Sequence, residues 1–119
     1  MNAAVDPEKL VIGACMLASD AIRFASEVLA PDDFRSMDMA EVFRAIVQAH
    51  KAQEFVEPFT VWTRATKAGV KNIQITDLHD WMGLAGSAES TAFYAREVKE
   101  IATRRRMSMA ASRFTQNLS

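Results

Sequence analysis

Apolar residues recur along this chain at the three- and four-residue spacing that places them on one face of an amphipathic helix. The segment Met37–Lys51 shows the pattern best, and its apolar face consists of Met39, Val42, Phe43, Ile46, Val47 and His50. The same spacing predicts helices over residues 7–18, 21–29, 58–68, 77–84 and 89–116. Two β-branched residues in the connection at 70–76 would suit a short extended segment, but no partner strand can be identified.

The first predicted helix is more apolar than an ordinary surface helix. No charged residue occurs between Leu10 and Leu17. Asp6 is suited to cap the helix and Pro7 to occupy its first position. Gly13 lies inside the helix, where glycine costs about 1 kcal/mol relative to alanine, so it needs a compensating reason. We therefore expect another backbone to pack close to Gly13.

Turn-forming residues mark the ends of the predicted helices. Pro31 ends the second helix, and Gly69 follows the helix at 58–68 as a C-cap glycine. The candidate N-caps are Ser19-Asp20, Ser36 or Asp38, and Thr76. The last helix is longer than about 25 residues, which suggests an element that leaves the globule. We expect a single domain with a helical head at 1–88 and a long C-terminal helix at 89–119.

Composition supports an all-α fold and narrows the class of protein. Only 4 glycines and 3 prolines occur in 119 residues, half of the residues are hydrophobic, and 24% are charged. The net charge of −1 does not predict nucleic-acid binding by the domain as a whole. No signal peptide and no apolar stretch of membrane-spanning length can be identified. The expectation is a cytoplasmic protein without a membrane partner.

A search for reactive groups finds no catalytic, cofactor-binding or metal-binding residue. The phosphate-binding loop pattern is absent, and the glycines at 83–86 are interpreted as a structural turn. His50 and His79 are too far apart in sequence to suggest a metal site, and the lone Cys15 lies in an apolar helix that would raise its pKa. Asp32 and Asp33 are interpreted as capping residues.

Side chains of the last helix are the best candidates for contacts with partners. Arg104–Arg106 is interpreted as a solvated or protein-contacting face, with nucleic-acid contact as the weaker alternative, and a Glu100–Arg104 pair is available. Val98, Ile101 and Met109 would be exposed unless this helix packs on another copy. Phe43, Trp62, Trp81 and Tyr94 are expected in the core, with one tryptophan half-exposed. The partner-binding candidates are Tyr94, Val98, Ile101, Arg104, Arg105, Arg106 and Met109.

Four stretches of the chain resemble the N-terminal domain of DnaB-type replicative DNA helicases. "EKLVIGACMLAS" resembles the family's E-Q-S-V-L-G-A-L-L-L, with matches at Glu8, Val11, Gly13, Ala14 and Leu17. "LAPDDFRSMDMAEVFRAI" resembles L-x-x-E-D-F-Y-x-x-x-H-R-x-I-F-x-A-I, although Met39-Ala40 replaces the His-Arg pair and Arg35 replaces the tyrosine. "EPFTVWTRATKAG" occupies the place of the I-D-x-V-T-L helix. "STAFYAREVKEIATRRRM" resembles Y-Y-A-R-x-V-x-E-x-x-x-x-R-x-L, with matches at Tyr94, Ala95, Arg96, Val98, Glu100 and Arg105.

The resemblance implies a fold and a non-catalytic role. It implies a helical head whose first helix is the central strut, followed by a helical hairpin of which the last helix is the first arm. It implies a collar domain that assembles into dimers and hexamers and contacts the primase and the helicase loader, with DNA bound only indirectly. No cofactor is expected in this chain, because ATP and Mg²⁺ would belong to a C-terminal motor domain.

Three alternatives remain open at this point. The helicase-binding domain of a bacterial primase shares a similar head and hairpin. A free-standing phage protein could use the same fold to bind or inhibit a helicase. A small nucleic-acid-binding protein could use Arg104–Arg106.

Overall fold

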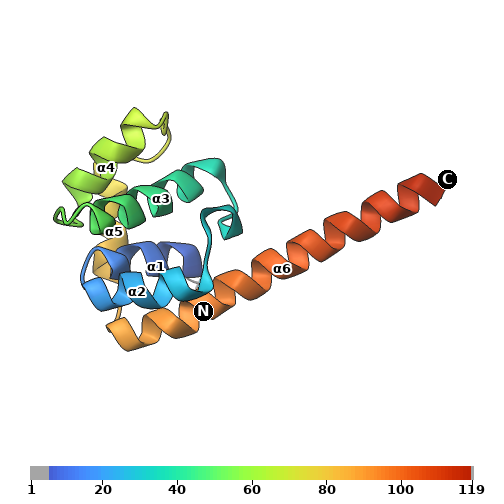
Figure 1. Ribbon diagram of the computed structural model, residues 1–119, viewed down its shortest axis with the longest axis horizontal. Helices are drawn as coiled ribbons and strands as arrows, with labels where there is room; N and C mark the ends of the chain where they lie inside the picture. Colours follow the sequence, from blue (N-terminus) through green and yellow to red (C-terminus); the bar gives the residue numbers. More distant parts are fainter. Residues whose placement is uncertain (1–5, 119) are drawn as a thin grey trace.

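The computed structural model of the chain describes residues 6–118 and is all-helical, with no strand in that range. Its elements gather into a head from which one long helix extends (Figure 1). In chain order they are α1 (Pro7–Cys15), α2 (Ser19–Val28), the 3₁₀ turn η1 (Pro31–Asp33), α3 (Met37–Lys51), α4 (Pro58–Lys67), α5 (Ile75–Leu84) and α6 (Ala88–Leu118). This confirms the predicted all-α fold with a long C-terminal helix.

Helix α1 is the central element of the head. It contacts α2, α3, α5 and α6, and Val11 and Ile12 have no exposed surface. At Gly13, an added Cβ would lie only 2.0 Å from the backbone oxygen of Trp81 in α5. The expectation that another backbone approaches this glycine is therefore confirmed. It also explains why so apolar a segment can sit at the start of the chain.

The helix ends agree with the sequence where a side chain caps them. The carboxylate of Asp6 accepts a hydrogen bond from the Glu8 N–H at 2.9 Å, and Ser36 Oγ accepts one from the Met39 N–H at 3.1 Å. Gly69 adopts a φ of 103° directly after α4, as a C-cap glycine does. Helix α3 has the predicted bounds.

Two predicted caps are wrong. Helix α2 begins at Ser19 itself, because Ala18 is the extended residue before it and no side chain caps this end. Helix α5 begins at Ile75, and Gln74 precedes it; the Asp77 carboxylate accepts the Gln74 N–H at 2.8 Å. The predicted cap Thr76 is therefore already inside the helix. Helix α1 also stops at Cys15, before residue 18.

The core is formed mainly by the inner faces of the short helices. In α3 the buried residues are Met39, Val42, Phe43, Ala45, Ile46 and Ala49. His50 is exposed, so its assignment to the apolar face was wrong and Ala49 takes that place. Phe43 and Trp81 are buried, whereas Trp62 and Tyr94 are half-buried against the core. Val70 and Ile73 also enter the core from the connection before α5.

Helix α6 packs on the head over its first half only. Its buried residues are Thr91, Ala95, Val98 and Ala102, and it contacts α1, α2 and η1. Val98 is 1% exposed, so the expectation that it would be exposed on an unpaired helix is wrong. None of the helices in the described range is long and apolar enough to span a membrane.

Candidate interaction surface: the arm and its junction with the head

The second half of α6 projects beyond the head (Figure 1). The contacts of α6 with the head extend as far as Arg106, and we call residues 107–118 the arm. At 1.5 Å per residue the arm is about 18 Å of helix. All of its side chains are exposed, including four large apolar ones. Their exposed fractions are 66% for Met107, 51% for Met109, 66% for Phe114 and 73% for Leu118.

Three of these four side chains share one side of the arm. An α-helix turns by about 100° per residue, so Met107, Phe114 and Leu118 fall within an arc of about 60° together with Ala111. We call these four residues the arm face. Met109 lies about 200° from Met107 and is therefore on the opposite side. The spacing of 4, 3 and 4 residues is that of a helix seam that pairs with another helix.

The arm face lies on the side of α6 opposite to the head. Val98 is buried in the head, and Met107 follows it by about two and a half helical turns, which places the two side chains on opposite sides. The arm face therefore cannot be covered by a continuation of the contacts that α6 makes with its own head. Within residues 6–118, nothing covers it.

Two of the three consecutive arginines join α6 to the head. Arg106 Nη1 lies 2.8 Å from Asp33 Oδ1, and its Nη2 donates to the Asp32 backbone oxygen at 2.9 Å. Arg105 Nη2 donates to the Asp33 backbone oxygen at 3.3 Å. These two residues, interpreted from the sequence as a solvated or protein-contacting face, contact another part of the same chain, and Arg106 stays 43% exposed while it does so. The N–H groups that bind Asp32 and Asp33 are not available for contacts with phosphates, which weakens the nucleic-acid alternative.

Arg104 is more exposed than Arg106: its side chain is 74% exposed, against 43% for that of Arg106. It forms the predicted ion pair with Glu100, one turn earlier on the same helix. Such exposed pairs contribute little to stability. Tyr94 and Ile101 are half-buried, and Tyr94 meets Phe93 edge-to-face with ring centroids 5.3 Å apart. The contact of Arg105 and Arg106 with the η1 turn is called the junction below. The seven predicted partner-binding residues thus lie in three places: the core, the junction and the surface.

Asp33 is the centre of the junction. Its side chain is 1% exposed and accepts the Ala30 N–H at 2.8 Å, while Lys99 Nζ lies 3.1 Å from Oδ2. Burial alone would raise the pKa of Asp33, but the Ala30 N–H, Arg106 and Lys99 outweigh it and lower the pKa below the usual 3.8. The interpretation of Asp33 as a capping residue is correct, and the residue also binds α6.

Glu8 is a second buried carboxylate with the opposite behaviour. It is 7% exposed and accepts the Arg35 N–H at 3.0 Å. Burial raises its pKa above 4.5, and the Arg35 N–H offsets only part of that effect. Glu8 has no ion pair among the residues that the structure describes, so its charge is less well compensated than that of Asp33.

The remaining titratable groups do not form a reactive site. Burial raises the pKa of the Cys15 thiol to about 12, which keeps it protonated at neutral pH. Between residues 6 and 118, no group of three or more His, Cys, Asp or Glu side chains could hold a metal ion. His50 and His79 are both exposed. Within residues 6–118 these groups therefore do not indicate a metal centre or a reactive thiol.

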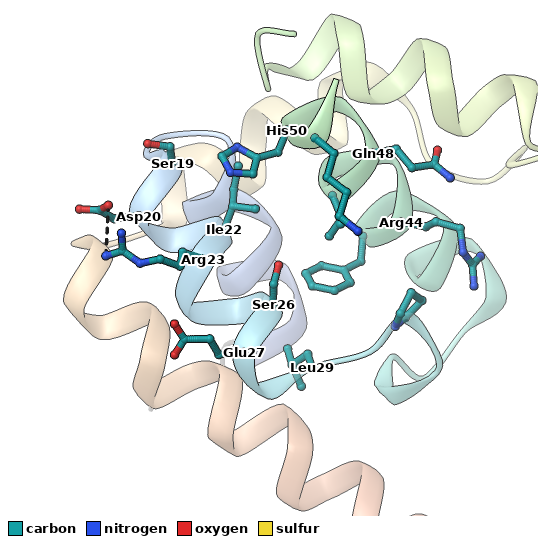
Figure 2. Close-up of a pocket in the computed structure, with 14 residues that line it drawn as sticks. Ser19, Asp20, Ile22, Arg23, Ser26, Glu27, Leu29, Arg44, Gln48 and His50 are labelled. Carbon is teal, nitrogen blue, oxygen red and sulfur yellow. Dashed lines mark ion pairs between the residues drawn. The ribbon is translucent and has the colours of Figure 1, made fainter. Parts of the chain in front are cut away.

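A groove of about 770 Å³ lies in the head between α2 and α3 (Figure 2). Its floor includes Ile22, Leu29 and Phe43, which are nearly fully buried. Charged side chains such as those of Asp20 and Arg23, an ion pair at 3.4 Å, stand at its edge.

Sequence reasoning missed Met107, Phe114 and Leu118, which form most of the arm face. Their spacing was visible in the sequence, but the polar residues between them make the apolar density of this region low. Counting matches to a seam spacing from Met107 onward would have identified them. It would also have separated them from Met109, which had been grouped with the partner-binding residues.

Comparisons with known proteins give one consistent family. The sequence matches the family described as "DnaB-like helicase N terminal domain" over residues 1–100. A curated relative, the replicative DNA helicase DnaC of Bacillus subtilis (strain 168), is 29% identical over 115 residues. That match covers 95% of this chain and 25% of the relative, so the chain spans a quarter of the relative's length.

Two solved structures have a similar fold. The N-terminal domain of DnaB helicase from Mycobacterium tuberculosis superposes with a TM-score of 0.87 at 28% identity, covering 95% of this chain and 82% of that one. The N-terminal domain of DnaB helicase from Helicobacter pylori, described together with its interactions with primase, gives a TM-score of 0.78 at 20% identity. It covers 95% of this chain and 89% of that one.

Proposed function

This chain belongs to the family of DnaB-like helicase N-terminal domains, and from this premise we propose that it acts as the assembly and recruitment domain of a replicative DNA helicase. In this role it has no catalysis of its own and binds no cofactor. ATP and Mg²⁺ would be bound by a separate motor domain. DNA would be engaged only indirectly, through the assembled helicase in the cytoplasm.

The observation that carries the proposal is the arm face. Met107, Phe114 and Leu118 are each more than 60% exposed, and they share one side of a helix that has left its own head. Exposed apolar surface on an isolated helix costs free energy that pairing with another helix recovers. A second copy of the chain offers the matching seam, so the domain would associate through its arms. Larger rings up to a hexamer would need further contacts between heads.

A primase and a helicase loader are the proposed heterologous partners. The Helicobacter pylori neighbour, a domain of the same fold, is described with its interactions with primase. The head of this chain offers a groove and a mixed-charge surface of the kind that supports specific binding without catalysis. These partners distinguish the proposal from the alternative of a nucleic-acid-binding protein.

Sedimentation velocity of the full chain over a range of concentrations tests the pairing. The double variant Met107→Glu/Phe114→Glu places two carboxylates on the arm face and should weaken association by about 100-fold or more, because each buried charge would be unpaired. The control is Met109→Glu, which adds one carboxylate on the opposite side of the arm and should leave association unchanged.

Co-precipitation with the primase from the same cell tests recruitment. The immobilised full chain should retain the primase, and Met109→Glu should retain it equally. A chain that stays strictly monomeric at all concentrations and retains neither primase nor loader would overturn the proposed function.

A further inference from the structure

We propose that Asp33 is a latch that fixes the direction in which the arm leaves the head, by binding Lys99 and Arg106 at the point where α6 departs. Asp33 therefore acts as a positioning residue for the arm. The inference rests on the proposed function only where it concerns pairing between copies, because the direction of the arm is a property of a single chain.

The first argument is the place of the contacts along α6. The buried residues of this helix end at Ala102, so apolar packing alone leaves the following turn unrestrained. Lys99, Arg105 and Arg106 all reach the η1 turn from this last stretch. They attach the helix at the end of its contact with the head, where a small rotation would move the tip of the arm furthest.

The second argument is the rigidity of the element that receives these contacts. The η1 turn begins with Pro31, whose ring fixes φ. The carboxylate of Asp33 also accepts the Ala30 N–H at 2.8 Å, which holds the side chain in place before α6 binds it. Asp33 is 1% exposed while the side chains of Lys99 and Arg106 are 45% and 43% exposed, so these are partly buried pairs, which salt screens less than fully exposed ones.

The third argument is the contrast with the neighbouring arginine. Arg104 pairs with Glu100 within α6 and so cannot influence how the helix is attached to the head. Arg106 in α6 instead contacts Asp33 in η1 at 2.8 Å, and these two residues are 73 positions apart in the chain. Arg104 and Arg106 therefore have the same chemistry two positions apart, but only Arg106 belongs to the latch.

A fixed arm direction has a consequence for association. Two arms that are already held at one angle lose less conformational freedom on pairing than two arms that sample many angles. The latch would thus set the angle between two paired heads and strengthen the pairing.

Distances between spin labels within one chain test the latch directly. Labels are placed at Gln48→Cys in α3 and Gln116→Cys near the arm tip, both exposed positions, in the full chain carrying Cys15→Ala. An excess of unlabelled protein ensures that only distances within a chain are measured. Asp33→Asn removes the charge but keeps an oxygen that can accept the Ala30 N–H. Arg106→Ala removes one of the two cationic partners of Asp33, and Arg104→Ala is the matched control.

The expected result is a narrow distance distribution for the parent and for Arg104→Ala, and one about twice as wide or more for Asp33→Asn and Arg106→Ala. Far-UV circular dichroism identifies any variant that has lost its helices. If Asp33→Asn proves to be unfolded, the comparison of Arg106→Ala with Arg104→Ala decides the result. Unchanged widths in the folded latch variants, or equal broadening in Arg104→Ala, would overturn the latch. A parent chain that proves monomeric would contradict the proposed function and leave this measurement valid.

Discussion

Gly13 of α1 lies against the backbone of Trp81 in α5 so closely that an added Cβ would be 2.0 Å from the Trp81 oxygen and 2.5 Å from its carbonyl carbon. The neighbouring atoms are backbone, so they cannot move aside by a change of rotamer. The crossing of α1 and α5 therefore depends on the absence of a side chain at one position. This crossing also holds the central helix of the head in place.

We predict that Gly13→Ala destabilises the head by about 2–4 kcal/mol, because the two helices must separate to admit the methyl group. Urea unfolding followed by circular dichroism measures the change. Gly83→Ala is the matched control: it is also helical, and an added Cβ there meets nothing within 4 Å. That control should be neutral or stabilise the protein by up to about 1 kcal/mol, whereas equal effects of both substitutions would contradict the account.

The lowered pKa of Asp33 predicts that its ionised form stabilises the folded state. This contribution is fully present above the unfolded pKa near 3.8 and is lost as the pH falls through the lower folded pKa. Asp33→Asn should therefore destabilise the protein at pH 7 by about 1–3 kcal/mol. The loss of unfolding free energy in this variant, measured by urea unfolding, should become smaller in strong acid. A loss that does not change with pH would contradict a stabilising role for the charge of Asp33.

Glu8 should behave in the opposite way because its folded pKa is raised. Protonation then favours the folded state, so the parent gains stability as the pH falls from the folded pKa toward the ordinary value of 4.5. Glu8→Gln keeps an oxygen for the Arg35 N–H and should be neutral or slightly stabilising at pH 7. A stability curve for this variant that follows the parent between pH 7 and the ordinary value would contradict the prediction.

Cys15 should be unreactive in the folded protein. It is 1% exposed, and burial raises its pKa to about 12. At pH 8 a reagent therefore cannot reach the sulfur, and the thiol is not ionised to the reactive thiolate. In buffer, a colorimetric thiol reagent should label Cys15 only as fast as the protein unfolds. In concentrated urea, it should label Cys15 at once. Immediate labelling of the native chain would show that the α1 environment is more open than described.

Local patterns in the sequence sufficed to predict most of the helices. Met37–Lys51 was predicted at both ends because Ser36 caps its first turn, and Gly69 was predicted as a C-cap because α4 ends there. The predicted cap of α2 was wrong because this helix begins after Ala18 without a side-chain cap, and that of α5 was wrong because the helix begins one residue before Thr76, after Gln74. Gly13 was interpretable because a glycine inside an apolar helix requires a close neighbour.

The junction could not be predicted from local patterns. Arg105 and Asp33 are 72 positions apart, and a run of arginines near the end of a chain is usually solvated. Val98 was expected on an exposed face because nothing in the sequence shows how far α6 runs along its own head. These contacts depend on the tertiary arrangement of α6, which local patterns in the sequence do not reveal.

Chemical cross-linking at single positions of the arm tests most directly whether the arm face pairs two copies. In the full chain carrying Cys15→Ala, a short bis-maleimide is applied to Ala111→Cys on the arm face and to Met109→Cys on the opposite side. The account predicts efficient covalent dimers for Ala111→Cys and few for Met109→Cys. Equal yields at the two positions, or dimers mainly through Met109→Cys, would contradict it.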